Sequence, residues 1–113
     1  MSVKSLSDEN FQQLLEAEGI SFIDFWAEWC GPCKSFAKIF ESVSEEHEDI
    51  QFGSIDIQHA EELTASLEIR SVPHLLVIKD GVIIYSEAGA LTKSSLQELI
   101  DQAREAQVTT EEN

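Results

Sequence analysis

Apolar and polar positions in the first part of the chain predict a helix followed by a buried strand. Ser7 precedes two acidic residues, a pattern typical of a helix N-terminus. Three apolar residues then follow at helical spacing: Phe11, Leu14 and Leu15. Residues 20–26 are rich in β-branched and aromatic side chains, and this composition predicts a buried strand.

The pattern returns to a helical period after residue 33. Four apolar residues recur there at positions i, i+3, i+4 and i+7: Phe36, Ile39, Phe40 and Val43. This spacing predicts the inner face of a helix that reaches about residue 47. Further along the chain, we expect a strand over residues 50–57 and a short helix over residues 60–67.

The last third of the chain predicts a hairpin and a final helix. An apolar run at residues 75–78 is followed by a turn at 79–81 and a second strand over 82–86. Thr92 suits the N-cap of a helix with four inner residues: Leu96, Leu99, Ile100 and Ala103. Because strands and helices alternate first and a hairpin follows, the sequence predicts an α/β fold with a mixed sheet.

Length and charge limit the class of protein. A chain of 113 residues with 42% apolar residues fits one domain, which we place at residues 1–107, before a polar tail at 108–113. The net charge of −15, from 22 acidic and 7 basic residues, disfavours binding to nucleic acids and to anionic membranes. No stretch has the length and apolarity of a signal peptide or a membrane span, so we expect a cytoplasmic protein.

The segment Cys30-Gly31-Pro32-Cys33 contains the only two cysteines, at the junction of the predicted strand and the amphipathic helix. A disulfide at this spacing closes so small a ring that its stabilising effect is only roughly 2 kcal/mol. Such a bond is a poor structural link and a good reversible switch. In a reducing cytoplasm, a close cysteine pair is more often catalytic or metal-binding than structural.

The predicted position of the pair favours thiol chemistry. Cys30 would lie at the helix N-terminus, where free backbone N–H groups and the positive end of the helix dipole stabilise a thiolate. Pro32 suits the first helical turn, and Gly31 permits the close approach of another backbone. Cys33 would lie one turn further in and be less exposed. Cys30 could then attack a substrate disulfide, and Cys33 could resolve the mixed disulfide.

Two other interpretations of the cysteines remain open from the residues alone. The pair can form a static disulfide or stay as idle thiols, although a reducing compartment argues against both. The pair can also hold a metal, but a zinc site would need two further ligands. The three histidines, His47, His59 and His74, are scattered along the chain.

Asp24 interrupts an otherwise apolar strand. A buried carboxyl group without a partner has a raised pKa and can exchange protons near neutrality. Asp24 could therefore take the proton from Cys33 when that thiol becomes a nucleophile. The alternatives are an aspartate on the solvent face of the strand and a carboxylate satisfied by backbone donors.

The eleven residues from Asp24 to Lys34, Asp-Phe-Trp-Ala-Glu-Trp-Cys-Gly-Pro-Cys-Lys, closely resemble the active-site segment of the thioredoxin family. Arg70-Ser71-Val72-Pro73 is similar to the segment that carries the family's cis-proline, and residues 88–93 resemble the glycine turn before its last helix. The resemblance spans residues 3–106. It implies the thioredoxin fold, a mixed sheet of about five strands flanked by about four helices.

The resemblance also implies a role for each residue of the site. Cys30 would be the attacking thiol, Cys33 the resolving thiol and Asp24 the buried proton acceptor. Trp26 would pack beside the cysteines. The substrate would dock in a groove formed by four residues: Trp29, Val72, Pro73 in the cis form, and Gly89. Without the resemblance, Val72 and Gly89 read as an apolar loop residue and a turn glycine.

Three positions depart from the family's usual pattern. Lys38 stands where a proline is usual within the active-site helix, so we expect a helix without the usual kink. Many members carry a lysine on the third strand near the buried acid. We assign that position to Phe52, and the loss of a cation there should raise the pKa of Asp24 further. His74 follows Pro73 where a small hydroxyl residue is common, and reads as a strand-end histidine or as a group that touches substrate.

By resemblance, the chain is a protein-disulfide reductase that cycles between a Cys30–Cys33 dithiol and a disulfide. It would bind no cofactor itself and would receive electrons from NADPH through thioredoxin reductase. Its partners would be that reductase and proteins with reducible disulfides, and the chain would be a monomer. The main alternative is a protein-binding module that uses the same groove without turnover. A role as oxidant or isomerase is less favoured, because the Gly-Pro pair resembles reducing members.

Overall fold

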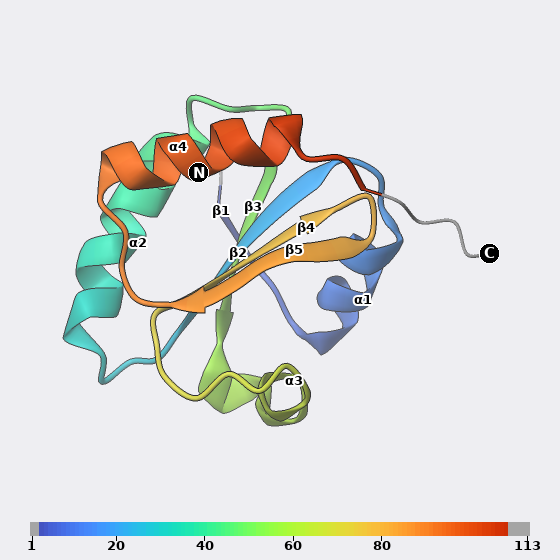
Figure 1. Cartoon of the computed structure of the whole chain (residues 1–113). Helices are drawn as coiled ribbons and strands as arrows, with labels where there is room; N and C mark the ends of the chain where they lie inside the picture. The colour runs from blue at the N-terminus through green and yellow to red at the C-terminus, as the bar shows by residue number, and fades with distance from the viewer. Residues whose placement is uncertain (1–2, 109–113) are drawn as a thin grey trace.

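The computed structural model of the chain describes residues 3–108, and these residues form a five-stranded sheet between helices (Figure 1). The first half contains β1 (Val3–Ser5), α1 (Asp8–Glu16), β2 (Ile20–Trp26), α2 (Gly31–Ser44) and β3 (Gln51–Asp56). The second half contains the short 3₁₀ helix η1 (Ile57–His59), α3 (Glu61–Ser66), β4 (His74–Lys79), β5 (Val82–Ala88) and α4 (Lys93–Glu105). The predicted tail lies outside the described residues, apart from Val108.

The sheet has the strand order β1-β3-β2-β4-β5. β2 is parallel to β3, which is parallel to β1, whereas β4 is antiparallel to both β2 and β5. The mixed sheet predicted from the sequence is therefore confirmed. β2, whose residues 21–25 are all buried, lies at the centre of the sheet, where both of its faces are covered.

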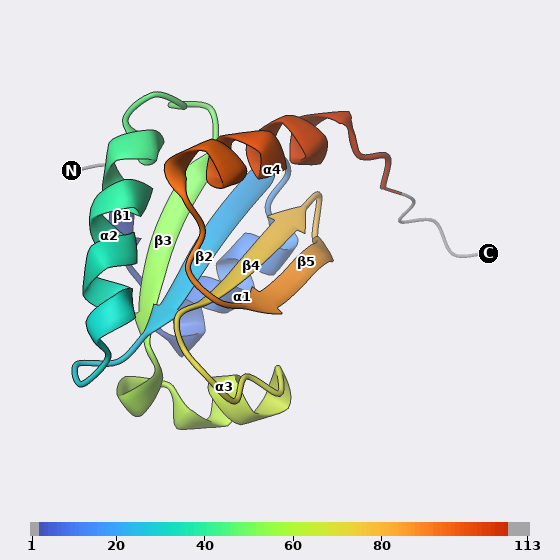
Figure 2. The same ribbon diagram turned by 60° about the vertical axis from the view of Figure 1, so that its left-hand side comes forward.

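Helices cover both faces of the sheet, with α2 and α4 on one side and α1 and α3 on the other (Figure 2). Phe22 of β2 packs with residues of α2 and α4, whereas its neighbours Ile23 and Phe25 pack with residues of α1 and α3. Successive side chains of a strand point to opposite faces, so Asp24 shares the face of Phe22. The chain thus directs one carboxyl group of its central strand toward α2.

The helix starts follow the sequence pattern closely. Ser7 caps α1, since its hydroxyl accepts a hydrogen bond from the backbone N–H of Asn10 at 3.5 Å. Thr92 caps α4 in the same way, with the N–H of Ser95 at 3.1 Å. α2 runs without interruption through Lys38 and ends at Ser44, three residues before the expected end.

Two short elements were not predicted from the sequence. β1 has only three residues, none of them buried, so it carries no apolar period that a sequence pattern could show. It forms because its backbone pairs with the edge of β3, with Val3 opposite Phe52. η1 begins after Asp56, whose carboxylate accepts a hydrogen bond from the N–H of Gln58 at 2.9 Å. Within residues 3–108, none of the helices combines the length and apolarity needed to cross a membrane.

Candidate active site

The two cysteines form a disulfide at the N-terminus of α2. Cys30 is the N-cap residue, with extended backbone, and its sulfur accepts a hydrogen bond from the backbone N–H of Cys33 at 3.1 Å. The two Cα atoms are 5.3 Å apart. The helix end therefore directs a backbone donor at the sulfur of Cys30, in a position that also stabilises negative charge on that sulfur.

Both sulfur-bearing residues are largely buried, with 4% of Cys30 and 2% of Cys33 exposed. Gly31 and Pro32, the first two residues of α2, are exposed between them. Trp29 lies just before the pair, and 68% of it is exposed, far more than the other large apolar residues described. Buried sulfurs next to an exposed aromatic side chain are suited to a reaction with another macromolecule that covers this surface.

A second segment lies against the disulfide from the other side of the site. The peptide bond between Val72 and Pro73 is cis, as the resemblance implied. The carbonyl oxygen of Val72 is 3.6 Å from the sulfur of Cys30. Gly89, whose φ of 117° favours glycine, donates its N–H to the carbonyl oxygen of Pro73 at 2.8 Å. The fold thus brings together three loops that are far apart in the sequence.

Trp26 packs beside the cysteines, as the resemblance also implied. It is half-buried against a small cluster formed by Ala27, Cys30 and Cys33. Val72 contacts the same cluster. The two tryptophans therefore occupy different environments: Trp26 packs against the cysteines, and Trp29 is exposed on the surface beside them.

Asp24 is buried on the face of the sheet that α2 covers, with 2% of the residue exposed. Its Oδ1 atom has no hydrogen-bond partner within residues 3–108. Burial raises the pKa of this carboxyl group from 3.8 to about 7. The structure therefore excludes the alternative in which Asp24 faces solvent.

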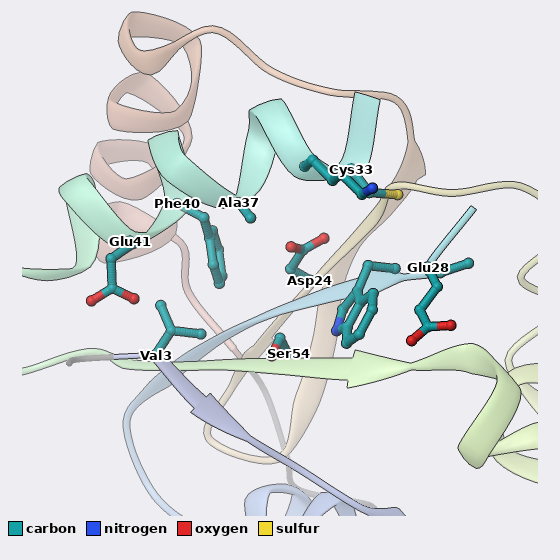
Figure 3. Close-up of a pocket in the computed structure, with 11 residues that line it drawn as sticks. Val3, Asp24, Glu28, Cys33, Ala37, Phe40, Glu41 and Ser54 are labelled. Carbon is teal, nitrogen blue, oxygen red and sulfur yellow. The ribbon is translucent and has the colours of Figure 1, made fainter. Parts of the chain in front are cut away.

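A pocket of about 700 Å³ connects Asp24 with the resolving end of the cysteine pair. Asp24, Cys33 and Ser54 line it together, and Figure 3 shows the carboxylate of Asp24 pointing toward the helix that carries Cys33. Glu28 and Glu41 also line the pocket. A carboxyl group with a pKa near neutrality in a space shared with Cys33 can exchange a proton with that thiol.

The residue on β3 that lies opposite Asp24 is Ser54, and the assignment of that position to Phe52 is wrong. Phe52 lies opposite Phe22, and their ring centroids are 5.6 Å apart in the aromatic core. Residues 52 and 54 are two apart and share one face of the strand, so periodicity alone does not separate them. The expectation that this position carries no charge holds for Ser54 as well.

His74 lies on the opposite face of the sheet from Asp24. Its ring meets Phe25 edge-on, and its Nε2 atom is 2.8 Å from the hydroxyl of Ser86. Only 8% of the residue is exposed. Burial lowers the pKa of the imidazole, against a smaller opposite effect of Glu87. These contacts agree with a strand-end histidine rather than with a group directed at substrate.

The histidines do not complete a metal site with the cysteines. Among the residues that the structure describes, no group of three or more histidine, cysteine, aspartate or glutamate side chains could hold a metal ion. Several residues that line the pocket beside Asp24 were not predicted from the sequence. Lys34, Ala37 and Glu41 follow one another at helical spacing along α2, and this period after Cys33 is the signal that could have identified them.

Comparison with known proteins agrees with this geometry. A sequence model of the thioredoxin family matches residues 2–102. A relative in Streptomyces coelicolor is 39% identical over 103 residues, which cover 91% of this chain and 77% of that protein. Thioredoxin C-2 of Corynebacterium nephridii is 37% identical over 89% of this chain and 95% of its own length. Thioredoxin of Bacillus subtilis is 35% identical over 89% of this chain and 97% of its own length. The chain therefore belongs to the thioredoxin family of thiol–disulfide oxidoreductases.

Proposed function

We propose that this chain reduces protein disulfides, with Cys30 as the attacking thiol, Cys33 as the resolving thiol and Asp24 as the proton acceptor. One observation carries the assignment of roles. Cys30 is the N-cap of α2, and the pocket next to it joins Cys33 to a buried carboxyl group whose pKa is about 7.

The first step begins from the reduced form of the pair. The thiolate of Cys30 attacks one sulfur of a substrate disulfide, and a mixed disulfide forms while the other substrate sulfur leaves as a thiolate. The N–H of Cys33 and the positive end of the α2 dipole stabilise the negative charge on the sulfur of Cys30 before the attack. Gly31 and Pro32, the exposed first residues of α2, leave this end of the helix open to a substrate.

The second step releases the reduced substrate. Asp24 takes the proton of the Cys33 thiol, and the resulting thiolate attacks the sulfur of Cys30. The Cys30–Cys33 disulfide forms as the bond between Cys30 and the substrate breaks, and the second substrate sulfur leaves as a thiolate that takes up a proton from solvent. Two electrons have then passed from the cysteine pair to the substrate, and the protein is left in the oxidised form that the structure shows.

The substrate segment docks on the surface around the disulfide. Trp29 supplies an exposed apolar contact on one side. On the other side, the backbone of Val72 lies next to Cys30, and Gly89 is joined to this segment by its hydrogen bond to Pro73. An extended peptide can use such backbone groups for hydrogen bonds, which do not depend on the peptide's sequence. This arrangement supports a reductase with many protein substrates.

The oxidised pair needs two electrons to return to the dithiol. We assign this step to thioredoxin reductase with NADPH, because that is the usual partner of the family, and the chain itself then needs no bound cofactor. We place the reaction in the reducing cytoplasm, with residues 1–107 acting as one monomeric domain. Proteins with accessible disulfides are the substrates.

The test is NADPH-coupled reduction of insulin disulfides in the presence of a thioredoxin reductase. The wild-type chain should support steady NADPH consumption, and Cys30→Ser should abolish it because no attacking thiol remains. Cys33→Ser should stop turnover as well but should accumulate mixed disulfides. A non-reducing gel detects these as a species of higher mass that disappears when a reducing thiol is added.

Three outcomes would contradict the proposal. Turnover by Cys30→Ser at the wild-type rate would exclude Cys30 as the nucleophile. Mixed disulfides that accumulate with Cys30→Ser instead of Cys33→Ser would reverse the two roles. A folded wild-type chain that consumes no NADPH with any thioredoxin reductase, yet still retains partners when both cysteines are alanine, would favour a binding module over a reductase.

A further inference from the structure

The pocket beside Asp24 has an excess of negative charge. Its lining includes three carboxyl groups, those of Asp24, Glu28 and Glu41, and one cation, Lys34. β3 contributes only the neutral hydroxyl of Ser54. Cys33 is in the disulfide and carries no charge. The groups that face Asp24 from α2, from β3 and from the loop before α2 therefore leave its charge largely uncompensated.

The rest of the pocket surface is apolar. Val3 of β1, Ala37 and Phe40 of α2, and Trp26 of β2 form its walls. Figure 3 shows Asp24 in the middle of the pocket, with Phe40 and Ala37 on one side and Glu28 on the other. Its volume of about 700 Å³ lies in the range of cavities that hold small molecules, which are typically about 300–1,000 Å³.

We propose that this pocket binds a small organic cation, a primary alkylammonium ion, with the ammonium group against Asp24 and the alkyl chain against Phe40 and Ala37. Asp24 lines the pocket with its carboxylate directed toward α2, and its buried Oδ1 atom has no partner within the described residues, so the carboxylate can still accept a hydrogen bond from an N–H donor. The apolar walls accept an alkyl chain and would not favour a hydrated inorganic ion. No described cluster of side chains has the ligands that a metal ion needs.

Binding of such a cation depends on the charge of Asp24. Burial raises the pKa of Asp24 to about 7, so the carboxylate form predominates at pH 8 and the neutral form at pH 6. Glu28, Glu41 and Lys34 are the other charged groups that line the pocket. The affinity at pH 8 should therefore exceed the affinity at pH 6 by about tenfold.

A bound cation would also affect the thiol chemistry. It would hold Asp24 in the ionised form and weaken its ability to take up the proton of Cys33. This consequence rests on the proposed function, whereas the binding itself does not. The oxidised protein binds without turnover, so a binding experiment and the insulin assay can fail independently.

The experiment uses the oxidised full-length chain at about 0.15 M salt and n-butylammonium chloride as the probe. Backbone amide spectra are recorded during titration at pH 6 and pH 8, with n-butanol as the neutral ligand of the same length. We expect saturable shifts at the pocket residues Ala37 and Ser54, stronger binding at pH 8, and no saturable shifts with butanol. Asp24→Asn, which keeps the shape of the side chain, should lose the binding.

The net charge of −15 gives a separate explanation that the design must exclude, because any cation collects near so acidic a surface. Non-specific binding would survive in Asp24→Asn, since that variant changes the net charge by only one unit. Persistence of the shifts in that variant would overturn the proposal, and so would equal binding of butanol. If Asp24→Asn does not fold, equal affinity of the wild-type chain at pH 6 and pH 8 would still overturn it.

Discussion

Asp24 of β2 and Ser54 of β3 lie directly opposite each other in a parallel strand pair, and both line the pocket under the active-site helix. The carboxyl group is buried and the hydroxyl opposite it carries no charge. Burial is the cause of the raised pKa of Asp24, and no cation offsets it strongly. The proton affinity of this site is therefore set by burial, and a positive group at residue 54 would oppose that effect.

Replacing Ser54 with lysine should lower the pKa of Asp24. The pocket has room for the longer side chain, and an ammonium group within about 4–6 Å of a carboxylate favours the charged form by about 1–3 pKa units. Titration of the side-chain carboxyl carbon by NMR would follow the change. Ser54→Ala is the matched control, because it removes the hydroxyl without adding charge and should leave the pKa near the wild-type value. Equal titration of Ser54→Lys and the wild-type chain would contradict this prediction.

The buried carboxyl group of Asp24 should make the protein less stable as the pH rises. Its pKa is about 7 in the folded chain and near 3.8 when unfolded, so between these values the folded state binds more protons. The stabilising effect is complete below the unfolded pKa and is lost as the pH rises through 7. Between pH 5 and pH 8, the free energy of unfolding should fall by about 2.5 kcal/mol through this group alone.

Asp24→Asn isolates that contribution. Urea unfolding of the two oxidised proteins at pH 5 and pH 8 gives four free energies of unfolding. The fall from pH 5 to pH 8 should be larger in the wild-type chain than in the variant, by the amount stated for Asp24. Any constant cost of the buried amide cancels in this difference. If the two proteins had parallel pH profiles, Asp24 would not titrate near neutrality.

Most of the fold follows from the spacing of apolar residues. The strand at residues 20–26 and the helix that carries Phe36 and Phe40 are long and strongly periodic, and both are present where the pattern places them. β1 is different, since three residues without a buried side chain gain their structure only from pairing with β3. Elements that depend on a partner strand are invisible to a local pattern.

The site divides in the same way. The position of Cys30 at the start of α2 follows from a strand, a cysteine pair and an amphipathic stripe in that order. The cis bond before Pro73 and the approach of Val72 to Cys30 are long-range features, and only the family resemblance pointed to them. Register decided between Phe52 and Ser54, because both occupy one face of β3.

Lys79 should contribute to stability through the end of α4. Its Nζ atom donates to the carbonyl oxygens of Ala103 at 2.7 Å, Arg104 at 3.0 Å and Ala106 at 2.7 Å. Ala103 also accepts the backbone N–H of the C-cap residue Ala106, at 3.3 Å. The last carbonyl groups of a helix lack the usual i+4 partners, and a cation is favoured at this end of the dipole. Lys79→Met keeps the aliphatic stem and should lower the free energy of unfolding by roughly 2 kcal/mol.

Lys93→Met is the matched control for that variant. Lys93 also makes a contact, with Glu46 at 3.4 Å, but about half of each side chain is exposed. Such a surface ion pair contributes less than about 1 kcal/mol. Each variant loses one positive charge, so urea unfolding of both at pH 7 compares the two losses of free energy of unfolding at the same net charge. Equal effects of the two variants would show that net charge, rather than the contact with the helix end, determines the loss, and a larger effect of Lys93→Met would also contradict the prediction.

His74 should act on stability in the opposite direction to Asp24. Burial lowers the pKa of its imidazole below 6.5, so at acidic pH the unfolded chain binds the proton more tightly than the folded chain. This contribution is complete above pH 6.5 and is lost as the pH falls from there through the folded pKa. His74→Gln keeps a polar group for Ser86 but cannot titrate.

The comparison of the wild-type chain with His74→Gln removes the background of the other groups. Asp24, His47 and His59 are present in both proteins, so their effects cancel. From pH 7 to pH 5, the free energy of unfolding of the wild-type chain should fall relative to that of His74→Gln. The same comparison in an Asp24→Asn background should give the same fall, because the two residues lie on opposite faces of the sheet. A difference that is constant with pH would mean that the pKa of His74 is the same in the folded and the unfolded chain, which would contradict the effect of burial.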